Sequence, residues 1–202
     1  MASFDDGARA TSGLSHGRRG FPPADFRPAR YAGKLRALHG AAGALAIVLA
    51  AAAFIRLGVT LDAVVAGAFV CVLIALSVVD IQQRRLPNRI VLPAAAAMLA
   101  VQIALHPERA PEWALAAASA ALLLLLPLFV FPGAMGMGDV KLALLLGAGL
   151  GVGVATALML AFVSAGLFGL AIVVRDGAEA RRRTIAFGPF LAAGAIATML
   201  FA

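Results

Sequence analysis

Two aspartates lie where long apolar segments of this chain meet polar sequence. Asp80 closes the apolar segment 69–79, and Asp139 follows Gly136-Met137-Gly138 at the start of another apolar segment. A carboxylate costs about 2.5–3.5 kcal/mol at the centre of an inserted helix and less near the interface, so acids kept at such places are candidates for function. Two such acids indicate a paired-carboxylate site, which can share one proton and activate water.

Each aspartate also has a purely structural interpretation. Asp139 is suited to cap the N-terminus of a helix, and Asp80 can pair with Arg84, four residues later on the same helix face. As members of a catalytic pair, they experience opposite helix dipoles: the C-terminal helix end at Asp80 favours a protonated acid, and the N-terminal end at Asp139 favours an ionised one. Gly136 and Gly138 let the backbone bend and approach a ligand closely.

The composition is that of an integral membrane protein. Of 202 residues, 62% are hydrophobic and 13% are charged, whereas soluble domains are about half apolar and a quarter charged. Several segments approach the roughly 20 apolar residues that cross about 30 Å of hydrocarbon. The predicted fold is therefore an all-α polytopic membrane protein, a bundle of about seven transmembrane helices.

The predicted bundle has a six-helix core at residues 61–202 and an additional N-terminal helix at 38–57, preceded by a disordered basic cytoplasmic tail at 1–37. The helix count, six or seven, depends on the uncharged stretch 142–174, which is interrupted by glycines at 147–153. One long helix there would put the arginines at 181–183 on the opposite side of the membrane from the other basic residues, against the positive-inside rule, so two helices are preferred. The helices are predicted at 38–57, 61–81, 90–105, 112–131, 139–151, 153–174 and 185–202.

The net charge of +7 is interpreted as a topology signal rather than as a nucleic-acid surface. If seven helices alternate, all 17 Lys and Arg residues except Arg56 and Arg109 fall on one side. The positive-inside rule then places the N-terminus and both aspartates at the cytoplasmic face and the C-terminus outside. The predicted helix 139–151 is only some 20 Å long, so Asp139 is expected to be recessed below the membrane surface.

The sequence offers no metal or cofactor site. His16 and His39 lie in or near the tail, and His106 lies in a turn on the outer side. The single cysteine, Cys71, excludes an intrachain disulfide and a C-x-x-C metal motif. We therefore expect neither metal nor cofactor, and a metalloprotease is disfavoured.

Around the aspartates, the chain resembles the type IV prepilin peptidases, membrane aspartic proteases that also include archaeal preflagellin peptidases. Asp80 with the following Arg-Arg-Leu-Pro-Asn at 84–88 is similar to the first aspartate motif of that family. Residues 136–142, Gly-Met-Gly-Asp-Val-Lys-Leu, are similar to its G-x-G-D-x-K-L motif, and residues 185–191 to its closing helix. The resemblance covers about residues 61–202 and leaves 1–57 unexplained.

The resemblance implies an aspartic endopeptidase of the bacterial inner membrane that cleaves the basic leader from type IV prepilins at the cytoplasmic face. Larger members also methylate the new N-terminus through a domain with paired C-x-x-C motifs, which this sequence lacks. We expect a peptidase without methyltransferase activity, closest to the short enzymes of tight-adherence (Flp-type) pili. The implied catalytic residues are Asp80 and Asp139, with Gly136, Gly138, Lys141, Pro87 and Asn88 as supporting or substrate-binding residues.

The expected partners are a prepilin or pseudopilin substrate, membrane lipids and the pilus assembly machinery, with no nucleic acid. The segment Phe187-Gly188-Pro189 is assigned a packing role and left outside the catalytic set. Two other classes of function remain open. One is a proton- or cation-coupled transporter that uses the aspartates as relay sites. The other is a noncatalytic membrane subunit of a secretion system.

Overall fold

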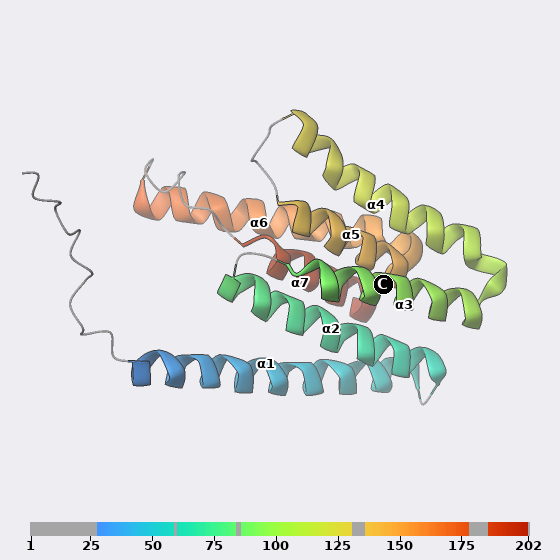
Figure 1. The fold of residues 1–202 in the computed structure, drawn as a ribbon, viewed down its shortest axis with the longest axis horizontal. Coiled ribbons are helices and arrows are strands. Elements are labelled where there is room, and N and C mark those ends of the chain that lie inside the picture. The colour runs from blue at the N-terminus through green and yellow to red at the C-terminus, as the bar shows by residue number, and fades with distance from the viewer. Residues whose placement is uncertain (1–27, 59, 84–85, 131–135, 178–185, 202) are drawn as a thin grey trace, which may run out of the picture.

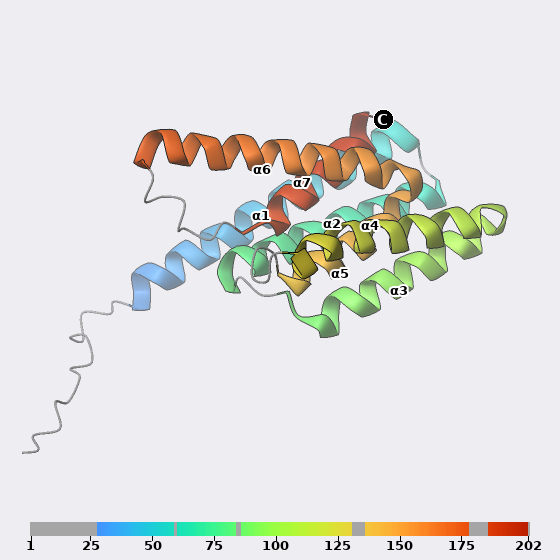
Figure 2. The same ribbon diagram turned by 90° about the horizontal axis from the view of Figure 1, so that it is seen from above.

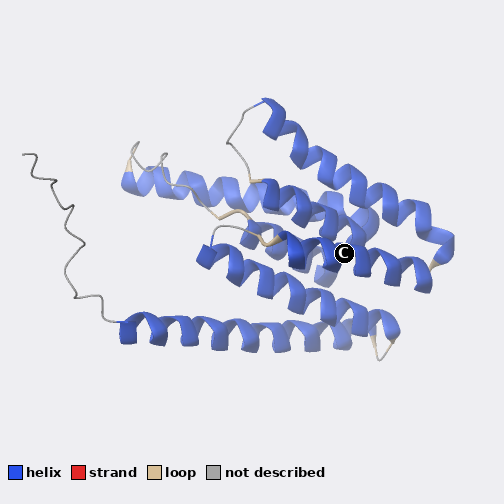
Figure 3. Cartoon of the chain, in the orientation of Figure 1, coloured by secondary structure: helices blue, strands red, loops and turns tan. Residues whose placement is uncertain are grey.

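The computed structural model describes residues 28–58, 60–83, 86–130, 136–177 and 186–201 (Figure 1). In these residues all regular structure is helical and no strand occurs (Figure 3), which confirms the predicted all-α class. The α-helices are α1 (Pro28–Leu57), α2 (Leu61–Gln83), α3 (Asn88–Leu105), α4 (Ala110–Val130), α5 (Met137–Leu150), α6 (Val154–Asp176) and α7 (Gly188–Phe201). Short 3-10 turns, η1 (Pro107–Arg109) and η2 (Gly151–Gly153), precede α4 and α6.

Successive helices run in alternating directions, so the bundle has two distinct ends (Figures 1 and 2). We call the end where α2 finishes and α5 begins the aspartate end. Five helical segments are long and apolar enough to cross a membrane, and the last of them, Met137–Asp176, contains both α5 and α6. These lengths and compositions fit the predicted polytopic membrane protein.

The short helix α5 lies at the centre of the bundle. It packs mainly on α4 and α3 and also touches α7, and Leu142, Ala143, Leu145 and Leu146 on it are almost completely buried. An interior position explains how a 14-residue helix, about 21 Å long, can be stable although it is shorter than the hydrocarbon layer. The neighbouring helices therefore enclose α5 from Val140 onward, whereas Met137 in its first turn is exposed.

The glycines at 147–153 separate two helices, as predicted. Gly151 has φ = 55°, a left-handed conformation that glycine adopts without a steric penalty, and it begins the turn η2. From this turn α6 runs back toward the aspartate end (Figures 1 and 2). The preference for two helices over one continuous span is thus confirmed.

The predicted helix boundaries were too tight. α1 begins at Pro28, so residues 28–37 are helical and do not belong to a disordered tail; residues 1–27 of that predicted tail lie outside the described part. Proline suits the first turn of a helix because its fixed φ is already helical. The predicted helix 38–57 corresponds to only the apolar part of α1, the candidate membrane span Leu38–Arg56. Three other helices, α2, α3 and α6, extend two residues further into polar sequence than predicted, where apolarity gives no signal, whereas α7 begins at Gly188 rather than at residue 185.

Close helix packing yields a first prediction about stability. Gly194 of α7 faces the carbonyl oxygen of Ala157 on α6, and an added Cβ would collide with that backbone atom. We expect Gly194→Ala to reduce the free energy of unfolding by about 1–3 kcal/mol, because the helices must separate to accept the methyl group. Thermal unfolding in detergent measures this, with Gly166→Ala as control because nothing lies within 4 Å of its added Cβ. Equal midpoints for the two variants would contradict the packing argument.

Candidate active site

Asp80 lies in the last turn of α2 and is only 6% exposed. Its Oδ2 accepts a hydrogen bond of 3.0 Å from the backbone N–H of Gly188, which is 108 residues later and is the first residue of α7. The first amides of a helix have no acceptor within their own helix. Asp80 supplies that acceptor, so the start of α7 fixes the orientation of the carboxyl group.

Gly188 has no room for a side chain beside this carboxyl group. A Cβ added there would lie 2.6 Å from Asp80 Oδ2 and 3.0 Å from its Cγ. The sequence analysis assigned Phe187-Gly188-Pro189 to packing and missed this contact with the first aspartate. The sequence did contain a local indication of this contact. Pro189 has no backbone N–H, so Gly188 is the residue at this helix start whose amide can donate to a group outside the helix.

Asp139 lies in the first turn of α5 and is half-buried. The helix begins at Met137, two residues earlier than predicted, and its N-cap is Gly136, with φ = −82° and ψ = 142°. The backbone N–H of Asp139 donates to the Gly136 carbonyl at 3.0 Å, and the Gly136 amide contacts the Asp139 carboxyl group. Asp139 is therefore not the N-cap residue itself; it is the third residue of the helix, and its carboxyl group reaches back to the amide of the N-cap Gly136.

The structure brings the two aspartates within electrostatic range of each other. A negative charge on Asp80 would act on the carboxyl group of Asp139, although the residues belong to different helices. Neither group is fully exposed to water, so their mutual repulsion is screened less than on a protein surface. Asp139 lies in the first turn of the short central helix α5, and its expected position below the membrane surface stays a prediction.

Several of the predicted supporting residues link the start of α3 to the first turns of α5. Gly138 faces Leu86, with 3.1 Å from an added Cβ to the Leu86 Cβ, and Pro87 is the extended N-cap of α3. Lys141 Nζ donates a hydrogen bond of 2.5 Å to Asn88 Oδ1. This last contact joins the two aspartate-containing motifs, α3 to α5, and gives the lysine a protein partner. Arg84 lies outside the described residues, as does Arg85, so the alternative pairing of Asp80 with Arg84 does too.

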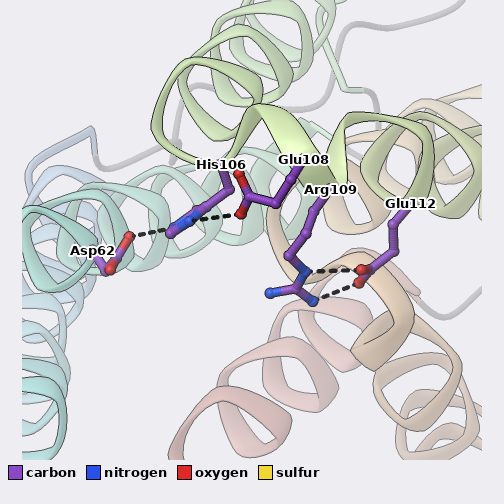
Figure 4. Close-up of polar contacts among 5 residues, drawn as sticks. All are labelled: Asp62, His106, Glu108, Arg109 and Glu112. Atoms are coloured by element: carbon purple, nitrogen blue, oxygen red, sulfur yellow. Dashed lines mark hydrogen bonds and ion pairs between the residues drawn. The ribbon is translucent and has the colours of Figure 1, made fainter.

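A second charged cluster lies at the opposite end of the bundle (Figure 4). There His106 Nε2 lies 3.0 Å from Asp62 Oδ1, and Arg109 binds Glu112 through two hydrogen bonds of 2.7 and 2.9 Å. Glu108 Oε1 is 3.8 Å from His106 Nδ1. These acids have basic partners and connect α2, the end of α3, η1 and α4. Within the described residues, no group of three or more His, Cys, Asp or Glu side chains is arranged to hold a metal ion.

A helical membrane bundle that joins two acids from separate helices is suited to acid–base chemistry at a membrane boundary. Residues 67–174, more than half of the chain, match the type IV leader peptidase family, and the chain belongs to that family. Asp80 and Asp139 both lie within the matched segment, whereas α7 with Gly188 lies beyond it. No curated protein and no solved structure matches the chain. The predicted family is confirmed, and with it a leader peptidase-like protease.

Proposed function

We propose that this protein is an aspartic endopeptidase that removes the basic leader peptide of Flp-type prepilins, with Asp80 and Asp139 as the catalytic pair. The observation that carries the proposal is that the last turn of α2 and the first turn of α5 place these two acids at the same end of the bundle, near enough for a charge on one to act on the other. Family membership supports peptide hydrolysis and gives no support to the transporter alternative.

In the proposed reaction, ionised Asp139 takes a proton from a water molecule between the two carboxyl groups. The resulting hydroxide attacks the scissile carbonyl carbon, while protonated Asp80 donates its proton to the carbonyl oxygen. The tetrahedral intermediate then collapses: the C–N bond breaks, Asp139 gives the proton it took from water to the leaving amine, and a hydroxyl group of the intermediate returns a proton to Asp80. The products are the free leader carboxylate and the new pilin N-terminus.

The hydrogen bond from Gly188 fixes the orientation of Asp80 in this scheme, although an N–H donor by itself favours the ionised carboxylate. The amide donates to Oδ2 of Asp80, and because a carbonyl-type oxygen is a better acceptor than a hydroxyl oxygen, Oδ2 is favoured as the oxygen without a proton. A proton on Asp80 therefore resides on Oδ1, the oxygen left for substrate and water. The amide thus presents the acid in one defined orientation.

The charge distribution supports a cytoplasmic position for the site in a bacterial inner membrane. In the described part of the bundle, Arg89, Lys141 and Arg175 lie at the aspartate end, whereas Arg56 and Arg109 lie at the other. This bias agrees with the positive-inside rule. A prepilin would then present its basic leader in the cytoplasm while its apolar helix stays in the bilayer.

Co-expression of the full chain with an Flp-type prepilin in bacterial membranes tests the proposal. We expect a shorter pilin band, and mass spectrometry should show a new, unmethylated N-terminus at the junction of leader and apolar helix. Cells that express the prepilin without the chain are the control and should retain the leader. An unprocessed prepilin in both strains would overturn the proposed substrate.

A further inference from the structure

An apolar groove opens between α2 and α3. These two helices touch each other only sparsely, because α3 packs mainly on α5 whereas α2 packs on α1 and α7. The resulting cavity has a volume of about 230 Å³. Its walls include Val65, Ala68 and Val72 of α2 and Ala94 and Ala97 of α3, and Leu145 of the central helix α5 forms part of its floor.

The lining is suited to another helix. Ala68 and Ala97 are exposed at its mouth, and small residues at such positions let a second helix backbone approach closely inside a membrane. The floor residue Leu145 is only 1% exposed, so it belongs to the rigid core. The groove is therefore a shaped surface supported by packed helices.

The groove leads toward the aspartates. Val72 precedes Asp80 by eight residues on α2, about 12 Å along the axis and about 80° around it. Ala94 follows Asn88 by six residues on α3, about 9 Å along that axis. A chain lying in the groove and continuing along α2 thus reaches the level of the first aspartate.

The other end of the groove meets a polar boundary. A second cavity of about 340 Å³ shares Val65, Phe69 and Met98 with the groove and is lined further out by polar side chains. At that boundary the 3.0 Å contact between His106 and Asp62 ties the end of α3 to the start of α2 (Figure 4). The apolar part of the groove is therefore limited to the stretch between this polar cavity and the aspartate end.

We propose that the groove between α2 and α3 is the docking site for the apolar helix of the substrate, an inference that rests on the proposed function. The 12 Å between Val72 and Asp80 correspond to about four extended residues or about eight helical ones. The side chains that enter the groove are then those about four to eight residues after the scissile bond. In this proposal the groove recognises the apolar helix of the substrate, and the two aspartates, at a separate position, cleave the peptide bond.

Cross-linking of the full chain in membranes tests this docking site. Cys71 is exchanged for Ser, Asp139→Asn keeps the substrate intact, and a single cysteine is introduced as Ala97→Cys in the groove. The control is Leu167→Cys on α6, an exposed position away from the groove. With a prepilin that carries one cysteine about six residues after the junction, we expect about tenfold more cross-linked product at position 97, because docking raises the effective concentration.

Equal cross-linking at positions 97 and 167 would overturn the docking site and leave the groove to lipid acyl chains. In an otherwise unaltered chain, Ala97→Phe should fill the groove and raise KM for the prepilin about tenfold relative to Leu167→Phe; an unchanged KM also counts against the docking site. The cross-link requires no cleavage, so it tests the groove independently. A parent chain that cross-links but never cleaves would overturn the proposed function and leave the docking site standing.

Discussion

Replacing either Asp80 or Asp139 by asparagine is expected to reduce cleavage of the prepilin by at least about a thousandfold. Asparagine preserves the shape of each side chain but cannot take a proton from water or deliver one to a leaving amine, and such proton transfers contribute about 10²–10⁴ each. Because the two groups act as one unit, losing either should cost nearly as much as losing both. The initial rate of processing in membranes, at matched protein levels, measures the effect.

The matched control is Asp176→Asn, which changes a third aspartate at the same end of the bundle, at the end of α6. It should process prepilin at the parent rate. Asp80→Asn should also unfold no more easily than the parent, because a neutral amide costs no more to bury than the carboxyl group in either form and its oxygen still accepts the Gly188 N–H. Processing by either asparagine variant would refute the paired mechanism and favour a noncatalytic membrane subunit.

Much of the fold was accessible from sequence because it depends on local composition. Uninterrupted apolar segments predicted where the helices lie, and the glycines at 147–153 predicted the reversal between α5 and α6. The positive-inside rule contributed to that second prediction, since it made one long helix unfavourable. The helix ends were missed because polar residues can continue a helix without adding to the apolar pattern. Pro28 at the start of α1 is the clearest example.

The candidate site was only partly accessible, because its contacts join distant parts of the chain. The motifs around Asp80 and Asp139 singled out both acids, but no pattern in the sequence pairs Asp80 with Gly188 or Lys141 with Asn88. Those contacts follow from how α7 and α3 pack against their neighbours. The groove between α2 and α3 was hidden for the same reason, since its lining alternates between two helices and resembles ordinary membrane-facing sequence.

Replacing Gly188 by alanine is expected to reduce kcat by about a hundredfold. The added Cβ would lie 2.6 Å from Asp80 Oδ2, well inside normal contact distance, so either the carboxyl group must rotate or α7 must move away. Both movements misplace the acid, and a displacement of about 1 Å can cost about 10² in rate. The measurement is the single-turnover rate of prepilin cleavage by purified protein in detergent.

A loss of folded protein must be separated from a loss of positioning, and α7 offers the control. Gly194→Ala changes the same helix and should destabilise the bundle, but its Cβ meets the backbone of α6 rather than the aspartate. Per folded molecule, Gly194→Ala should therefore retain the parent rate whereas Gly188→Ala should not. If both variants lose activity only in proportion to their unfolded fraction, Gly188 merely packs, as the sequence analysis assumed. If Gly188→Ala alone is slow, the start of α7 is part of the apparatus that orients Asp80.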